Sequence, residues 1–193
     1  MRVSTHAAAL ALVVMVGGSP AMAQDEYAAI RPKLETCFEC HRANGASDRP
    51  EFPILAGQEL YYIYVQLKDF AAGRRQDPIM SDVAKSLSKD EMQAIAKFFS
   101  EQTWPRTGYN SDPVLAHKGK IATVAGECVQ CHLGTFEGNS RIPRLAGQHK
   151  DYLKKTMLDL KSKARNNAAA IAALMASYSD EDITAMADYL AGM

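Results

Sequence analysis

The four cysteines of this 193-residue sequence fall into two identical motifs, each a Cys-x-x-Cys pair followed directly by a histidine. The residues are Cys37, Cys40 and His41 in the first motif and Cys128, Cys131 and His132 in the second. Such a motif attaches haem covalently, because the two thiols add to the porphyrin vinyl groups and the histidine that follows binds the iron. The sequence therefore predicts two covalently bound haem c groups.

Two other uses of paired cysteines fit the pattern less well. Two Cys-x-x-Cys pairs could form one four-cysteine zinc site, but zinc binding does not require a histidine after each pair. A thioredoxin-like redox pair belongs in a βαβ unit. The sequence contains no alternating strand pattern of convincing length, so this use is not favoured.

A haem iron held by one histidine needs a sixth ligand or keeps an open position. Methionine is the ligand that raises the reduction potential of electron-transfer cytochromes. Met80 follows Gln76, Asp77 and Pro78 in a predicted loop, from which it can reach a haem. We therefore expect Met80 to bind the iron of haem 1.

In the second half of the sequence, the position that matches Met80 does not supply a sixth ligand for haem 2. Met80 lies seven residues before Leu87, and the matching position before Tyr178 is Ile171, which cannot bind iron. Met175 lies about one helical turn later, and it is the remaining methionine outside the predicted helices. We expect Met175 to bind haem 2. The alternative is that Met175 belongs to the core and that haem 2 has another ligand or none.

The two motifs belong to two copies of one unit, because the second half of the sequence repeats the first at an offset of 90 to 91 residues. The segment PILAGQ at 53–58 recurs as PRLAGQ at 143–148. A repeat of this extent indicates two homologous domains. We place them at 24–104, with haem 1, and at 105–193, with haem 2. The prolines and glycine near this boundary interrupt any helical pattern.

The elements around the motifs are predicted to be helices. Apolar residues recur at helical spacing over 89–101, and Ser88 with Glu91 forms a capping box at the start of that helix. Ser179 and Asp182 occupy the matching positions in the second half. We therefore expect an all-α fold.

The N-terminus predicts export. A positive start, an apolar run over 7–16 and the sequence Ala-Met-Ala ending at Ala23 form a secretory signal peptide, residues 1–23, cleaved after Ala23. A membrane anchor would need about 20 apolar residues. We expect the mature chain to have no transmembrane segment and to lie in the periplasm. The 22 basic and 22 acidic residues balance, which excludes a strongly basic nucleic-acid-binding protein.

With these features the chain resembles the dihaem cytochrome c4 family. The resemblance covers nearly the whole mature chain and includes the FPxLAGQ segment at 52–58. It implies two tandem class I cytochrome c domains related by a pseudo-twofold axis. It also implies that the carbonyls of Pro53 and Pro143 accept hydrogen bonds from His41 and His132.

The resemblance implies a carrier of single electrons and not an enzyme. Its expected partners are redox proteins: a terminal oxidase, a cytochrome bc complex or a flavoprotein. One alternative is the electron-accepting cytochrome subunit of a sulfide-oxidising flavoprotein dehydrogenase. Another is a dihaem peroxidase, which would need an open sixth position on one haem.

Basic residues gather in one stretch of the second domain. They are Lys150, Lys154, Lys155, Lys161, Lys163 and Arg165. The stretch is either a solvated helix face or a docking patch for an acidic redox partner.

Overall fold

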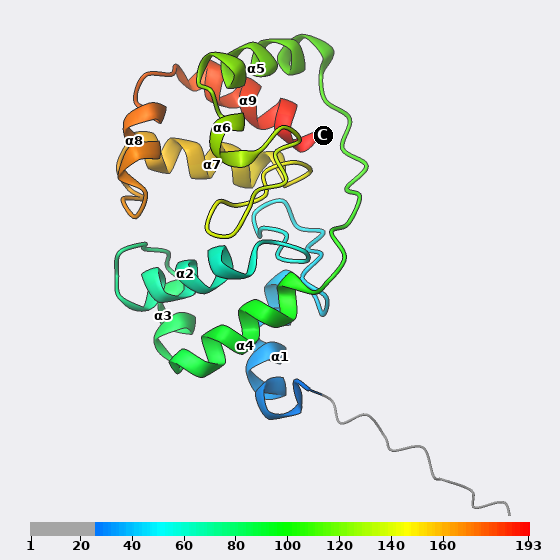
Figure 1. Cartoon of the computed structure of the whole chain (residues 1–193), viewed down its shortest axis with the longest axis vertical. Helices are drawn as coiled ribbons and strands as arrows, with labels where there is room; N and C mark the ends of the chain where they lie inside the picture. The colour runs from blue at the N-terminus through cyan, green and yellow to red at the C-terminus, as the bar shows by residue number, and fades with distance from the viewer. Residues whose placement is uncertain (1–25) are drawn as a thin grey trace, which may run out of the picture.

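The computed structural model describes residues 26–193, and within them the chain forms helices and turns with no β-strand. Figure 1 shows the N-terminal half as the lower unit and the C-terminal half as the upper. The lower unit contains η1 (Ala28–Ile30), α1 (Arg31–His41), α2 (Leu60–Ala71), α3 (Met80–Lys85) and α4 (Lys89–Ser100). The upper unit contains α5 (Pro113–Ala125), α6 (Val129–His132), α7 (Lys150–Lys161), α8 (Ala169–Met175) and α9 (Asp180–Ala191). The all-α prediction is confirmed.

The predicted signal peptide lies outside the described residues. Within residues 26–193, no helix combines the length and the apolar content that crossing a bilayer would take.

Side chains cap the helices where the sequence predicts it. The hydroxyl of Ser88 accepts the backbone N–H of Glu91 at 3.2 Å, and the Glu91 carboxylate accepts the N–H of Ser88 at 2.7 Å. Ser179 and Asp182 form the same capping box at α9. Asp112 caps α5 by accepting two N–H groups of its first turn. These caps satisfy N–H groups that a helix cannot pair internally.

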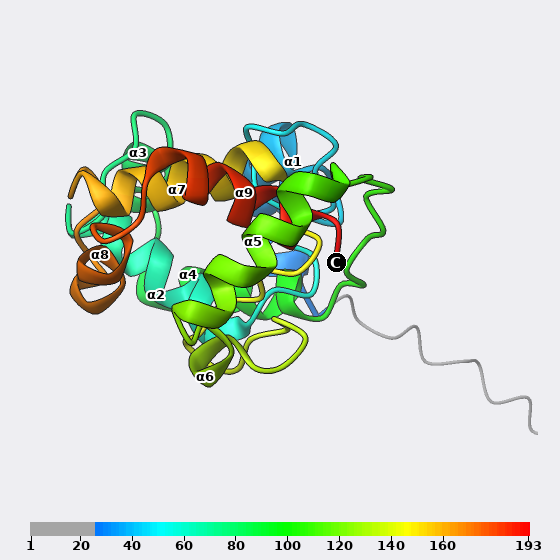
Figure 2. The ribbon, with the colours of Figure 1, turned by 90° about the horizontal axis from the view of Figure 1, so that it is seen from above.

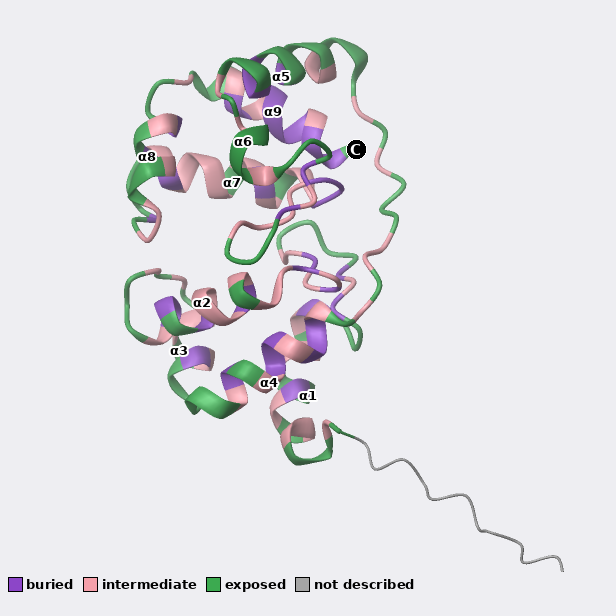
Figure 3. Cartoon of the chain, viewed as in Figure 1, coloured by how far each residue is buried: buried purple, intermediate pink, exposed green. Residues whose placement is uncertain are grey.

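Each unit packs its own apolar core (Figure 3). In the lower unit, Leu34 of α1, Leu67 of α2 and Met92 of α4 belong to one buried cluster. In the upper unit, Met186 of α9 is 1% exposed and packs with Ile183. Buried methionines at helical spacing are packing residues.

Helices α5 and α9 cross closely at a glycine, and Figure 2 shows this pair from above. A Cβ atom at Gly119 would lie 2.1 Å from the carbonyl oxygen of Ala185 and 2.8 Å from the Cβ of Tyr189. Because the nearest atom belongs to backbone, no rotation of a side chain could relieve the clash. Gly119 therefore sets how closely the two helices approach.

Gly119→Ala is expected to lower the free energy of unfolding by about 1–3 kcal/mol, because overpacking forces a backbone shift. The measurement is denaturant unfolding followed by circular dichroism. His117→Ala, at an exposed position of the same helix, is the control. Equal stability of the Gly119 variant and the control would contradict this account of the crossing.

The predicted domain boundary lies in the helix-free segment between α4 and α5, which runs along one side of the molecule (Figure 1). The boundary itself stays a prediction. In this segment Trp104 contacts both units: its backbone N lies 3.1 Å from the Cβ position of Gly57, and its indole nitrogen lies 3.1 Å from that of Gly147. The guanidinium of Arg144 lies 4.6 Å from the Trp104 ring centroid.

Two glutamines join the units reciprocally. The Gln58 side chain accepts the N–H of Arg144 at 2.8 Å and donates to the carbonyl of the same residue at 3.0 Å. The Gln148 side chain accepts the N–H of Ile54 at 2.9 Å and donates to its carbonyl at 3.0 Å. Gln58 matches Gln148 in the repeat, and Ile54 matches Arg144. The same contact made twice with the units exchanged is the mark of a pseudo-twofold axis.

Candidate haem sites

The first motif occupies the last turns of α1. Cys37, Cys40 and His41 lie at positions i, i+3 and i+4, so the helix brings them to neighbouring positions on one side. The helix ends at Arg42, whose φ is 67°. The ring nitrogen Nδ1 of His41 lies 2.9 Å from the carbonyl oxygen of Pro53.

The second motif is built in the same way with a shorter helix. Cys128 is the N-cap of α6, and His132 is its last residue. Nδ1 of His132 lies 2.9 Å from the carbonyl oxygen of Pro143. Leu133, with a φ of 65°, ends the helix as Arg42 ends α1. The carbonyl contacts expected from the family resemblance are thus present in both units.

The two histidines are prepared to bind a metal through Nε2. A carbonyl oxygen can only accept, so Nδ1 must donate and Nε2 keeps its lone pair. Burial lowers the pKa of His41 and of His132, and the bond to the proline carbonyl offsets part of this. Both imidazoles are therefore neutral at physiological pH, which is the form that binds iron.

Within residues 26–193 no disulfide joins the cysteines of either motif. Burial raises the pKa of Cys37 to about 11 and also raises the pKa of Cys128. Among residues 26–193, no three His, Cys, Asp or Glu side chains lie close enough to hold a metal together. The two cysteine pairs, one in each unit, therefore do not meet in a shared zinc site.

The two predicted methionine ligands have different surroundings. Met80 is the first residue of α3, half-buried against the lower core. The carboxylate of Asp77 accepts the N–H of Met80 at 2.9 Å and fixes the start of this helix. Met175 is the last residue of α8, 4% exposed, within the upper core. The assignment of Met80 and Met175 as iron ligands stays a prediction.

A polar cluster between the units was not assigned a role from the sequence. Arg75 of the lower unit donates to the Tyr152 hydroxyl at 3.0 Å, and Arg165 of the upper unit lies 3.4 Å from the Tyr62 hydroxyl. Gln66 accepts from both guanidinium groups, at 2.8 and 3.2 Å. The repeat contained a signal for this cluster, because Tyr62 matches Tyr152 and Arg75 matches Arg165. These residues carry polar groups, so packing of an apolar core does not explain why they recur.

This cluster is partly buried, and it holds two guanidinium groups. Arg165 is 8% exposed, and neither Arg75 nor Arg165 forms an ion pair within residues 26–193. Burial alone would raise the pKa of Tyr152, but the charges of Arg75 and Arg165 lower it to about 8. Buried charges in proteins are normally paired. The cluster therefore suits anionic groups.

Comparison with known proteins shows which family has this arrangement of motifs and helices. The family model described as Cytochrome c matches residues 116–193. Cytochrome c4 of Azotobacter vinelandii is 31% identical over 194 residues, covering 90% of this chain and 91% of the relative. The chain belongs to the cytochrome c4 family. The crystal structure of cytochrome c4 from Pseudomonas stutzeri superimposes with a TM-score of 0.78 at 31% identity, covering 86% of this chain and 97% of the other.

Members of the cytochrome c4 family are dihaem electron-transfer proteins, so the chain carries two covalently bound haem c groups. The family assignment and the two tandem cytochrome c domains expected from the sequence are confirmed. A related protein of Stutzerimonas stutzeri is named a thiosulfate dehydrogenase electron acceptor. It is 30% identical over 174 residues, covering 84% of this chain and 81% of the relative.

Proposed function

We propose that this chain is an exported, periplasmic carrier of single electrons. In it, Cys37, Cys40 and His41 hold haem 1 with Met80 as sixth ligand, and the second motif, ending at His132, holds haem 2. The observation that carries the proposal is the matched pair of histidines, each with Nδ1 2.9 Å from a proline carbonyl. The haem groups supply the one-electron chemistry.

The protein side chains hold and orient the haems. The hydrogen bond from Nδ1 fixes the plane of each imidazole and raises its basicity as a ligand. The guanidinium groups of Arg75 and Arg165 would pair with the carboxylates that every haem carries. Both haems would then point their charged edges toward the same buried cluster, on which the two units meet.

The reciprocal glutamine contacts support transfer between the two haems. Because Gln58 and Gln148 each bond to the opposite unit, the relative placement of the domains is fixed at two matched points. Rigid placement avoids reorganisation between electron-transfer steps. With both haems bound, this fixed placement of the units would favour electron transfer from one haem to the other.

A terminal oxidase or a cytochrome bc complex is the proposed partner. The test is to add the reduced protein to membranes of the organism that encodes it and to follow the visible spectrum. We expect reoxidation in air that cyanide stops. Absence of reoxidation would overturn the oxidase pathway.

A second candidate function is electron acceptor of a dehydrogenase. The relative from Stutzerimonas stutzeri, named a thiosulfate dehydrogenase electron acceptor, favours it. Reduction of the oxidised protein by a purified thiosulfate dehydrogenase with its substrate would support this role. Failure of that reduction, with cyanide-sensitive reoxidation by membranes, would favour the oxidase partner.

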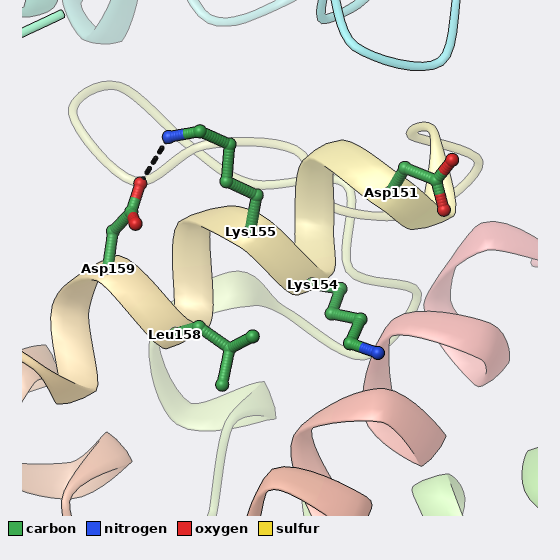
Figure 4. A pocket seen from close by; sticks show the side chains of 5 residues that line it. All are labelled: Asp151, Lys154, Lys155, Leu158 and Asp159. Atoms are coloured by element: carbon green, nitrogen blue, oxygen red, sulfur yellow. Dashed lines mark hydrogen bonds and ion pairs between the residues drawn. The ribbon is translucent and has the colours of Figure 1, made fainter.

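The basic stretch on α7 is less positive than the sequence suggests. Lys155 forms an ion pair with Asp159 at 2.5 Å, as Figure 4 shows, and Lys150 pairs with the buried Asp188 at 2.7 Å. Lys161 pairs with Asp180 at 2.6 Å. Lys154 and Lys155 line a shallow hollow together with Asp151 and Asp159. Three of the six basic side chains of the stretch are therefore neutralised by ion pairs.

We expect the rate of electron transfer to the partner to fall only weakly as salt rises, because screening acts on unpaired charge over about 10 Å at 0.1 M. Lys154 forms no ion pair among the described residues, so Lys154→Gln should slow transfer more than Lys155→Gln. Stopped-flow rates at low and high ionic strength measure both effects. A steep fall with salt, or a larger effect of Lys155→Gln, would contradict this view of the face.

A further inference from the structure

The helices α3 and α8 correspond in the repeat and share their pattern of burial, although α8 begins two residues earlier relative to the repeat. At an offset of 91 residues, Met80 matches Ile171, and both are half-buried. Ala84 matches Met175, and they are 0% and 4% exposed. Ile171 therefore occupies, in the second unit, the position that Met80 occupies in the first. Met175 does not occupy that position.

Met175 is packed as a core residue. Its side chain belongs to a buried cluster with Leu160 of α7 and Ile183 and Met186 of α9. Moving the Met175 side chain out of this cluster would open a cavity in the core, which destabilises the fold.

The group that positions Met80 is also missing from the second unit. Asp77 accepts the N–H groups of Ile79 and Met80 at 3.0 and 2.9 Å. Its counterpart at an offset of 91 is Ala168, the N-cap of α8, which makes no side-chain hydrogen bond. Both the ligand and the residue that orients it are thus replaced by apolar residues.

Two nitrogen-bearing side chains, one before α7 and one at its end, have partners elsewhere in the structure. Nε2 of His149 lies 2.8 Å from the carbonyl oxygen of Ser47, in the contact between the units. The ammonium group of Lys161 is paired with Asp180. The contact with Ser47 holds His149 between the two units, and the Lys161 ammonium group has no free electron pair for a haem iron.

We propose that haem 2 has no protein ligand at its sixth position and binds small neutral diatomic molecules there, with carbon monoxide as the probe. The chain from 168 to 174 reads AAAIAAL, so α8 offers a surface with no side-chain acid, base or hydrogen-bond donor. Such a surface suits neutral gases and not the proton transfers of peroxide chemistry. The inference rests on the proposed two-haem function and replaces the expectation that Met175 is a ligand.

The experiment is a titration of the dithionite-reduced holoprotein with carbon monoxide, followed by the visible spectrum. We expect one equivalent per chain, taken up by haem 2. Ile171→Met should restore the ligand at the matched position, abolish this uptake and strengthen the weak red absorption band that a methionine–ferric iron bond gives. Met80→Ala should raise the uptake to two equivalents.

Met175→Leu distinguishes a core residue from a ligand. The change conserves volume, so we expect the fold, the red absorption band and the uptake of one equivalent of carbon monoxide to remain unchanged. Absence of uptake in the unmodified protein, or uptake that appears only after Met175→Leu, would overturn the inference. An intact mass with fewer than two haems before any gas is added would instead overturn the proposed two-haem function.

Discussion

Met80→Ala is expected to lower the reduction potential of haem 1 by on the order of 0.2 V, within the range of about 0.8 V that axial ligands span. The sulfur of methionine favours the reduced iron, and its removal leaves a weaker ligand or none. The fold should survive, because Met80 is half-buried at the start of α3 and Asp77 can still cap that helix. A spectroelectrochemical titration measures the shift.

Met92→Leu is the matched control for this experiment. Met92 lies on α4 of the same unit and is 6% exposed within the core. A volume-conserving change there costs less than about 1.5 kcal/mol and should leave both potentials in place. Unchanged potentials in the Met80 variant would show that Met80 does not bind the iron.

The second large effect is expected from replacing Cys128 and Cys131 together by alanine. Without the two thioethers, haem 2 is not retained, so the intact mass should show one haem and the haem absorbance should fall by about half. The upper unit should also lose stability, because a domain of this size has a thin core without its cofactor.

Cys37→Ala with Cys40→Ala is the reciprocal variant. It should leave one haem in the upper unit and remove the spectrum of haem 1. Two haems in either double variant would contradict attachment through these pairs. Loss of both haems from either one would show that the units do not take up haem independently.

Local features of this chain were readable from the sequence. The Cys-x-x-Cys-His spacing, the capping boxes at Ser88 and Ser179 and the repeat each depend on residues close together or on simple matching. These patterns carry their own geometry, because a capping box is formed within four residues of chain. They were sufficient to predict an all-α chain of two tandem units.

Features that depend on the packing of distant segments were not readable. Gln58 and Gln148 are visible as a repeated residue, but their partners lie in the opposite unit, 86 and 94 residues away. Lys150 looks like a surface charge, whereas it neutralises the buried Asp188 on α9. Met175 was expected outside the helices, but it is the last residue of α8 and its side chain lies in the core of the upper unit.

The most direct test of the central claim, a two-haem carrier of single electrons, is a coulometric titration of the purified holoprotein followed by its visible spectrum. The account predicts two electrons per chain, taken up one at a time, with haem 1 and haem 2 at different potentials because it assigns a methionine ligand to haem 1 alone. Uptake of one electron or none, or a single concerted two-electron step, would contradict it.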